Sequence, residues 1–220
     1  MKPWHPLPDQ LPAEIAVFPL SGALLLPGGR LPLNIFEPRY LAMVLDSLAE
    51  GRMFGMIQGD PSRPRRADGG SAIFGVGCLG RLSSFAEMED GRLLITLTGV
   101  ARFQVMEELP MRRGYRRVRA DYGPFLADLE PETLPVPRAD ILQAVRPFFA
   151  AKGLEVNHEA IEALSGHALV TTLAMVCPFT VAEKQALLEA NTLPERASAL
   201  LALLRMGALG GELPPDARPS

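Results

Sequence analysis

The stretch FPLSGALLLPGGRLPLNIFEPRY, residues 18–40, decides how this chain folds. It opens as an extended run, turns at the Pro-Gly-Gly of residues 27–29, and resumes as a second extended run over residues 30–36. Glu37 then precedes Pro38, which suits the first turn of a helix because proline has no N–H to leave unpaired there. The charge of Glu37 also favours the positive end of the helix dipole. The stretch therefore predicts strand, turn, strand and helix as one packing unit.

The helix that follows is predicted to be amphipathic. Its apolar residues Leu41, Val44, Leu45 and Leu48 recur at the i, i+3, i+4, i+7 spacing of one helix face. Gly51 comes next and suits a left-handed helix cap. We expect this face to pack on the sheet.

Strands are predicted on both sides of this unit. Residues 14–18 and the short apolar run 53–58 read as strands, and residues 59–70 form a polar loop that we expect to be mobile and exposed. Before the first strand lies a proline-rich, loosely held lead-in over residues 1–13.

The centre of the chain predicts a β-hairpin. Asp90-Gly91 separates two runs of strand character, residues 73–85 and 92–100, and Asp-Gly between such runs is a strong hairpin signal. In the second run Leu93, Ile95 and Leu97 face one way and Leu94, Thr96 and Thr98 the other. Gly99 interrupts the run and indicates a bulge or bend. With residues 102–109 and 115–122 we count six or seven strands, which favours a small closed or partly open barrel.

The C-terminal part is predicted to be helical. Residues 124–137 contain four prolines, a linker composition, and beyond them the apolar period becomes that of helices. Asn157 is placed to cap a short helix, Pro147 to kink or shorten the helix before it, and Thr180 and Thr192 each open a capping box. The expected domains are residues 1–123, a linker over 124–137, and a helical bundle over 138–220, with a disordered tail from residue 210.

Composition excludes several classes of protein. The chain has 220 residues, a net charge of −3, 48% hydrophobic and 21% charged residues, which are ordinary globular values. Its two cysteines, Cys78 and Cys177, have no C-x-x-C spacing and imply neither a disulfide framework nor a zinc knuckle. No signal peptide and no run long enough to span a membrane is present, so we expect a cytoplasmic protein with no membrane partner.

Two motif matches fail on their context. Residues 75–80 read G-x-G-x-x-G, but they lead into a hairpin rather than a helix and no acidic residue follows at the ribose position, so glycines that let a curved strand bend are the better interpretation. The zincin-like run at His158 has Glu162 where the second histidine belongs; His158, Glu162 and His167 would give only a mixed set of ligands. No Walker A motif and no nucleophile–base pair is apparent. We expect no metal, no cofactor and no catalytic residue.

One basic cluster is present. It contains Arg112, Arg113, Tyr115, Arg116, Arg117 and Arg119. Arginines with an interleaved tyrosine suit a phosphate backbone with a stacked base. Acidic residues flank the cluster, and alternating charge on a hairpin is more often a solvated face. Nucleic-acid binding is therefore the alternative function rather than the leading one.

The order of these segments resembles the N-terminal domain of the ATP-dependent protease Lon, which stand-alone bacterial proteins of this size and the Lon-like domain of cereblon share. The opening FPL, LxPG and LPLxIFEPRY carries the resemblance, which continues through the DGR turn, the G-x-x-R-F-x-V strand and the helical segment 177–204. It covers about residues 14–205 and departs at Cys78 and in the arginine-rich segment 112–119. The positions that we expect to be a structural signature are Phe18, Pro19, Pro27, Gly28, Phe36, Glu37, Pro38, Arg39, Tyr40, Gly91, Gly99, Arg102 and Phe103.

The resemblance implies an α+β fold, in which a PUA-like β pseudo-barrel with one packed amphipathic helix is followed by a helical bundle. It also implies a non-catalytic module that binds unfolded or partly folded polypeptide, with a protease or chaperone component as a further candidate partner. In Lon this domain precedes an ATPase and a Ser–Lys protease, and neither motif occurs in these 220 residues.

The bare apolar run Leu24, Leu25 and Leu26 is our candidate for part of the polypeptide-binding surface, which we expect in a cleft between barrel and bundle. The alternative, equally open, is that these leucines fill one end of the barrel. If they form the surface, a Leu25→Asp variant would lose binding and keep its fold.

Overall fold

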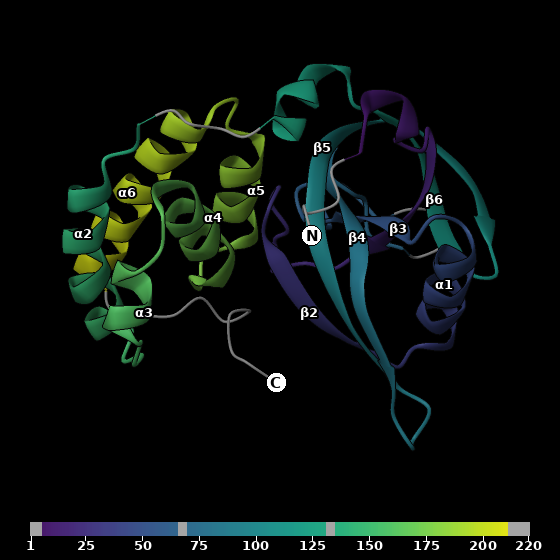
Figure 1. Cartoon of the computed structure of the whole chain (residues 1–220), viewed down its shortest axis with the longest axis horizontal. Coiled ribbons are helices and arrows are strands. Elements are labelled where there is room, and N and C mark those ends of the chain that lie inside the picture. Colours follow the sequence, from purple (N-terminus) through teal and green to yellow (C-terminus); the bar gives the residue numbers. More distant parts are fainter. Residues whose placement is uncertain (1–5, 66–69, 131–134, 211–220) are drawn as a thin grey trace. The chain divides into compact units, whose positions relative to one another are not determined.

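The computed structural model describes residues 6–65, 70–130 and 135–210, and the chain divides into two compact units, residues 1–131 and 132–220 (Figure 1). The first unit is rich in strands and is called the β unit below. The second is helical and is called the helical unit. The predicted α+β fold is confirmed.

The β unit is built on one sheet. Its strands are β1 (Glu14–Pro19), β2 (Arg30–Ile35), β3 (Met53–Ile57), β4 (Val76–Glu87), β5 (Leu93–Arg112) and β6 (Tyr115–Asp121). They are ordered β2-β5-β4-β3-β1-β6, and β6 pairs with β5 as well, so five strands close into a ring and β2 lies outside it on β5. β1 and β3 are parallel, and the other neighbouring pairs are antiparallel. A ring leaves few strand edges exposed to unwanted pairing.

The ring encloses an apolar core to which all five of its strands contribute. Its buried members are Ile15, Val17, Ile57, Ile73, Leu79, Ala101, Phe103, Val118, Ala120 and Tyr122. Phe103 is fully buried, and a side chain on Gly77 would lie 2.5 Å from its ring. Gly77 and Gly80 therefore lie in β4, and Gly75 lies directly before it. The missing side chain of Gly77 leaves space for the ring of Phe103, as the strand interpretation predicts.

Helix α1 (Pro38–Ala49) begins at the predicted residue, and Gly51 follows its end with φ +89°. Its buried face differs from the prediction by one position. Tyr40, Met43, Val44 and Ser47 are buried, whereas Leu45 is exposed.

The cause of this shift lies at both ends of α1. The Tyr40 ring lies 4.3 Å from the ring of Phe18, and the Ser47 hydroxyl donates to the Met43 carbonyl at 2.8 Å. Because that hydroxyl is satisfied within the helix, a serine can occupy a core position. The predicted stripe was wrong at Leu45, because α1 buries the face that carries Tyr40, Met43 and Ser47 and leaves Leu45 in solvent.

Strand β5 is longer than predicted. The two segments predicted around Gly99 form one strand, because a register shift against β4 bends it there without ending the pairing. A side chain on Gly99 would lie 2.0 Å from the Leu26 carbonyl oxygen. Because Gly99 has no side chain, the turn at residues 27–29 can lie directly against β5. Two hydrogen bonds hold it there: the Gly28 N–H donates to the Gly99 carbonyl at 3.0 Å, and the Gly99 N–H donates to the Gly29 carbonyl at 2.8 Å.

A buried ion pair fastens the end of the β unit. The 3₁₀ helix η2 (Gly123–Leu129) brings Asp128 to Arg102 of β5, and both side chains are nearly inaccessible to solvent. The carboxylate accepts from the Arg102 backbone N–H and from two guanidinium nitrogens, at 2.8–2.9 Å. The guanidinium also lies 4.6 Å from the centre of the Phe125 ring. Arg102 of the predicted signature is therefore structural, since it attaches η2 to the sheet.

The helical unit contains α2 (Arg138–Ala151), α3 (His158–Glu162), α4 (Gly166–Val176), α5 (Val181–Glu189) and α6 (Leu193–Leu209). Asn157 caps α3 and the Thr180–Glu183 capping box opens α5, as predicted. Thr192 caps α6, but Glu195 accepts from Asn191 N–H, one residue before the position that a capping box requires. Helix α2 continues past Pro147 to Ala151.

Four sequence-based expectations fall partly or wholly outside the described residues. They concern residues 1–5 of the lead-in, residues 66–69 of the polar loop, residues 131–134 of the proposed linker and the C-terminal tail from residue 211. Of the described loop residues, 61–65 are exposed as predicted. The prediction was wrong for Gly59 and Asp60, which are buried because Gly59 pairs with Ile73 in a β-bridge.

Candidate functional site

A groove of about 420 Å³ lies on the sheet where β2, β5 and β4 run side by side. Three residues from each strand line it: Pro32, Leu33 and Asn34; Leu94, Ile95 and Thr96; Ser84, Phe85 and Ala86. We call it the sheet groove. β4 and β5 continue beyond it into a hairpin that projects from the rest of the sheet (Figure 1).

The strand register explains the shape of the sheet groove. Pro32, Thr96 and Ser84 lie opposite one another, as do Asn34, Leu94 and Ala86. Residues directly opposite in an antiparallel pair point to the same face. Most of these side chains are short, so they leave a shallow depression on this face of the sheet, which forms the groove.

Two more exposed apolar residues, Phe36 and Met88, directly follow the strands β2 and β4 that line the groove. The Met88 N–H donates to the Arg92 carbonyl at 2.8 Å across the hairpin. Phe36 is 63% exposed, Leu94 44% and Met88 40%. Large apolar side chains gathered on one face, bordered by polar ones, are typical of a protein-binding surface.

No charged residue lines the sheet groove. Among the nine residues only Asn34, Ser84 and Thr96 have polar side chains, and all three can hydrogen-bond to a polypeptide main chain. A charge bound here would lose water without gaining a partner. The groove therefore suits an uncharged ligand.

The predicted surface residues Leu24, Leu25 and Leu26 do not form a surface. Each is at most 2% exposed, and Leu25 packs close to Gly80 and Leu97, because a side chain on Gly80 would meet both. Of the two interpretations, burial supports the one in which these leucines fill the interior. The Leu25→Asp variant is therefore unsuitable as a test of binding.

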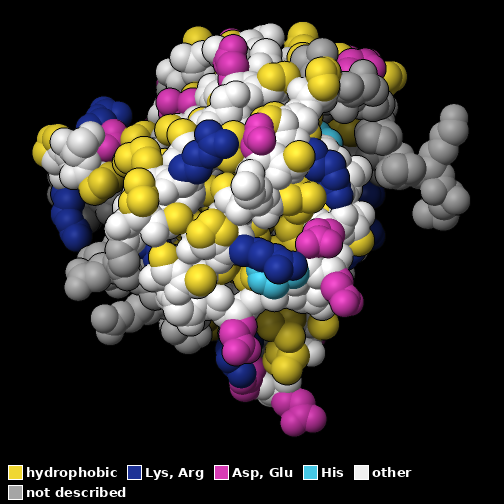
Figure 2. Space-filling view, turned by 90° about the vertical axis from the view of Figure 1, so that its left-hand side faces the viewer, with side chains coloured by type: hydrophobic (Ala, Val, Ile, Leu, Met, Phe, Trp, Pro, Cys, Tyr) yellow, Lys and Arg dark blue, Asp and Glu magenta, His cyan; other side chains and the backbone are white. Residues whose placement is uncertain are grey.

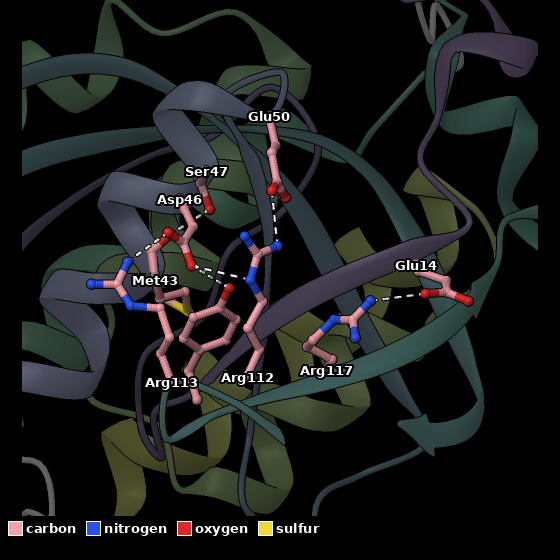
Figure 3. A network of polar contacts seen from close by, with 9 residues as sticks. Glu14, Met43, Asp46, Ser47, Glu50, Arg112, Arg113 and Arg117 are labelled. Atoms are coloured by element: carbon pink, nitrogen blue, oxygen red, sulfur yellow. Dashed lines mark hydrogen bonds and ion pairs between the residues drawn. The ribbon is translucent and has the colours of Figure 1, made fainter. Parts of the chain in front are cut away.

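The arginine cluster is neutralised by its own surroundings. Arg112 pairs with Glu50 and Asp46, Arg113 with Asp46, Arg116 with Glu108, Arg117 with Glu14, and Arg119 with Glu14 and Glu107. Five arginines thus face five carboxylates, and Figure 3 shows the part that links the β5–β6 hairpin to α1. Little net charge remains to attract a phosphate backbone.

Tyr115 and Asp46 form the centre of this network. The phenol of Tyr115 donates to Asp46 at 2.8 Å. Burial, together with this hydrogen bond to the carboxylate, raises the pKa of Tyr115 to about 12. Burial alone would raise the pKa of Asp46, but hydrogen bonds from Tyr115 and Arg113 outweigh it and lower that pKa. The tyrosine that suggested base stacking instead fastens a hairpin to a helix.

The remaining signature residues divide into packing, turn and surface positions. Phe18, Tyr40 and Phe103 are buried, and Gly28 and Gly91 have the positive φ that their turns require. Glu37 accepts from Arg39 at 2.8 Å, and the Arg39 guanidinium lies 4.6 Å from the Tyr40 ring centre. Phe36 is the large apolar exception, since it is exposed.

The helical unit has exposed apolar residues as well. They are Leu154, Val176, Met206 and Leu209. Figure 2 looks onto the side with α2 and α6, where hydrophobic side chains alternate with single charged ones. Such scattered exposure is normal for a surface.

No metal site is formed by the described residues, among which no three His, Cys, Asp or Glu side chains come together. His158 and Glu162 lie on α3, and His167 on α4. None of the helices in the described part of the chain combines the length and apolar content needed to cross a bilayer.

Comparison with known proteins gives a consistent result. The family model of the substrate-binding domain of ATP-dependent protease La (LON) matches residues 14–206. The Lon protease of Anaeromyxobacter dehalogenans is 26% identical over 205 residues, which is 89% of this chain and 23% of that protein. Lon protease 2 of Myxococcus xanthus is 25% identical over 205 residues, 89% of this chain and 24% of that protein. The chain thus spans about a quarter of the length of these relatives.

Two solved structures share the fold. The Lon N-terminal domain protein of Xanthomonas campestris has a TM-score of 0.61 and 22% identity, covering 86% of this chain and 97% of that one. The N-terminal domain of the Mycobacterium avium complex Lon protease has a TM-score of 0.57 and 17% identity, covering 90% and 98%. Because the family model matches most of its length, the chain belongs to the Lon substrate-binding domain family.

Proposed function

We propose that this chain is a non-catalytic module that binds segments of unfolded or partly folded polypeptide, and that it binds them at the sheet groove. The observation that carries the proposal is the match of residues 14–206 to a family whose named role is substrate binding. In the relatives, the matched segment is part of a protease.

The chemistry of the sheet groove supports polypeptide as the ligand. Leu94, with Phe36 and Met88 beside it, offers apolar contact to side chains of an unfolded segment. Asn34, Ser84 and Thr96 supply donors and acceptors for main-chain amides. An apolar centre with a polar border is what a peptide-binding surface needs.

A non-catalytic role fits the residues of the groove. Ser84 and Thr96 are the two hydroxyl nucleophiles among the nine lining residues, and no histidine, lysine, aspartate or glutamate lines the groove to activate either of them. The family match covers the substrate-binding domain and not an ATPase or a protease domain. The proposal places the module in the cytoplasm, where a protease or chaperone component would receive the bound polypeptide.

Substitution of Leu94 tests this placement. Leu94→Thr keeps a β-forming residue but removes an exposed apolar side chain that lines the groove. If Leu94 is one of the residues that dominate binding, its truncation should cost more than about 1 kcal/mol, roughly fivefold in affinity. We expect at least this loss in fluorescence anisotropy with a labelled, permanently unfolded protein, and an unchanged melting temperature.

The matched control is Leu126→Thr, because Leu126 on η2 is 43% exposed and lies outside the groove. It should bind like the unmodified chain. Equal binding by both variants would move the site away from the sheet groove. No binding of unfolded protein by the unmodified chain would refute the function itself.

A further inference from the structure

One edge of strand β2 is unpaired. β2 pairs with β5 along one side, and no strand of the described residues pairs with its other side. Three residues of β2, Arg30, Pro32 and Asn34, are exposed. An unpaired strand edge presents main-chain N–H and C=O groups that can bond to a further strand. The direction of these groups decides what the edge of β2 can bind.

The hydrogen bonds at the start of β2 show which of its residues face outward. The Gly99 N–H of β5 donates to the Gly29 carbonyl at 2.8 Å. In an antiparallel ladder, pairs that exchange hydrogen bonds alternate with pairs that do not. Because Gly29 bonds to β5, the residues Arg30, Pro32 and Asn34 do not. Their main-chain N–H and C=O groups therefore point away from β5, towards the free edge.

The β4–β5 hairpin leads to the same result. The Met88 N–H donates to the Arg92 carbonyl at 2.8 Å, so two rows further along the ladder Ala86 and Leu94 form a hydrogen-bonded pair. Leu94 thus directs its main-chain groups to β4. Asn34 lies opposite Leu94 on the β2 side and makes no main-chain bond to it.

The place of Pro32 in β2 agrees with this orientation, since proline lacks an N–H and occurs in edge strands where that group would face solvent. The edge thus offers the N–H groups of Arg30 and Asn34 as donors and the carbonyls of all three residues as acceptors. None of these groups forms a hydrogen bond within the part of the chain that the structure describes. Such a row of groups matches the main chain of another extended strand.

A second copy of this chain is a poorer partner for this edge. Two copies paired through β2 would each lack the N–H of Pro32, so two bonds would be missing, whereas pairing with a segment that has no proline loses only one. Such a segment also donates an amide N–H to the Pro32 carbonyl. The edge therefore suits a different polypeptide better than itself.

The side chains of an added strand would reach the sheet groove. Residues directly opposite each other in an antiparallel pair point to the same face. Pro32 and Asn34 line the sheet groove, so ligand residues opposite them direct their side chains to that face. Thr96 and Leu94 of β5 lie behind these two residues and also line the groove. Apolar ligand side chains at alternate positions suit this arrangement.

We infer that unfolded polypeptide binds by adding a strand to the free edge of β2, as an extended segment of about five residues. This inference rests on the proposed function and specifies its substrate class. Alternate amides of the segment pair with the main chain of Arg30, Pro32 and Asn34, and alternate apolar side chains lie over the sheet groove. A proline at a paired position of the segment prevents binding there, because it has no N–H to donate.

A pair of N-methylated peptides tests the strand addition. The probe is a fluorescently labelled peptide, Ser-Val-Thr-Leu-Thr-Val-Ser, with blocked ends. Antiparallel pairing with its apolar residues over the groove puts the amides of Val and Leu on β2 and those of Thr on the opposite edge. N-methylation of the Leu should weaken binding to the full chain by roughly two- to twelvefold, the net value of one hydrogen bond. N-methylation of the Thr beside it restricts the peptide in the same way and should have little effect.

A matched pair of variants tests the edge itself. Arg30→Pro removes an outward N–H without removing a bond to β5, so it should weaken peptide binding by a similar factor. Arg30→Gln removes the same charge and keeps the N–H, so it should bind like the unmodified chain. Thermal melting checks that both variants are folded, and the N-methylated peptides still test the inference if Arg30→Pro is not.

The outcomes separate this inference from the proposed function. If the two N-methylated peptides bind equally and Leu94→Thr weakens both, strand addition is wrong and the polypeptide-binding role stands. A loss confined to the Thr peptide means that the added strand is parallel, and it supports the edge of β2. If sedimentation shows a dimer that Arg30→Pro dissociates while peptide binding is unchanged, the edge serves a second copy and the inference is overturned. If neither the peptides nor unfolded protein bind, the proposed function fails as well.

Discussion

Two apolar regions of the β unit differ in their relation to solvent. Leu24, Leu25 and Leu26 are consecutive leucines at a turn and are almost completely buried. Phe36, Met88 and Leu94 are separated in sequence, yet they lie on or directly after the adjacent strands β2, β4 and β5 and stay exposed. Consecutive apolar residues thus mark the interior here, and the surface that suits a ligand is assembled only by strand pairing.

The largest effect that we expect comes from placing a charge in the first region. Leu25→Asp would bury a carboxylate with no partner, in addition to the ~2–5 kcal/mol that removing a buried leucine side chain costs. We expect a variant that is largely unfolded by circular dichroism, with Leu25→Met, which conserves volume, within about 1.5 kcal/mol of the unmodified chain. A folded Leu25→Asp variant would show that the run is not interior.

A smaller loss of stability should follow from a substitution at Gly99, which packs against the backbone of Leu26. In Gly99→Ala the new methyl group would lie 2.0 Å from the Leu26 carbonyl oxygen, so the turn must move, at a cost of about 1–3 kcal/mol by analogy with overpacked cores. Gly75→Ala is the control, because no atom lies within 4 Å of the added carbon and its φ is not positive. Urea denaturation compares the two, and equal stabilities would contradict the close approach of turn and strand.

These two regions also show how far sequence reasoning reaches. The hairpin at Gly91, the start of α1 at Pro38 and the caps at Asn157 and Thr180 were predictable because each depends on a few neighbouring residues. The alternation of Leu94, Thr96 and Thr98 was also visible in the sequence. Which face of that strand would stay exposed was not, because it depends on the pairing with β2 and β4.

The arginine cluster shows the same limit of prediction from the sequence alone. Its charges are local in sequence, but three of the five carboxylates that neutralise it, Glu14, Asp46 and Glu50, are more than 60 residues away. Only the ring closure by β5–β6 and β1–β6 pairing, with α1 alongside, brings them together. A basic patch in a sequence is therefore weak support for nucleic-acid binding until its partners are known.

We expect an intermediate effect on stability at Tyr115, which is buried and whose hydroxyl donates one hydrogen bond to Asp46. Tyr115→Phe removes the hydrogen bond to Asp46 and should cost about 1 kcal/mol. The folded-state pKa of about 12 exceeds the ordinary value of 10, so the phenol's contribution to stability is complete below pH 10 and is lost as the pH rises towards 12. Between pH 10 and 12 the unmodified chain should lose more stability than Tyr115→Phe, and parallel curves would contradict this role.

The smallest effect on stability is expected in the second region, at Phe36. Phe36→Ser removes an aromatic ring that is mostly in water, so the free energy of unfolding should change by less than about 1 kcal/mol. Tyr40→Ser, four residues along the same signature, removes a buried ring that packs on Phe18 and should cost about 3–5 kcal/mol. A role in the stability of the fold therefore explains why Tyr40 belongs to the signature, but it does not explain Phe36. If Phe36→Ser is stable and weakens binding of unfolded polypeptide while Leu126→Thr does not, Phe36 serves the sheet groove; if its binding is unchanged, the groove ends at Leu94.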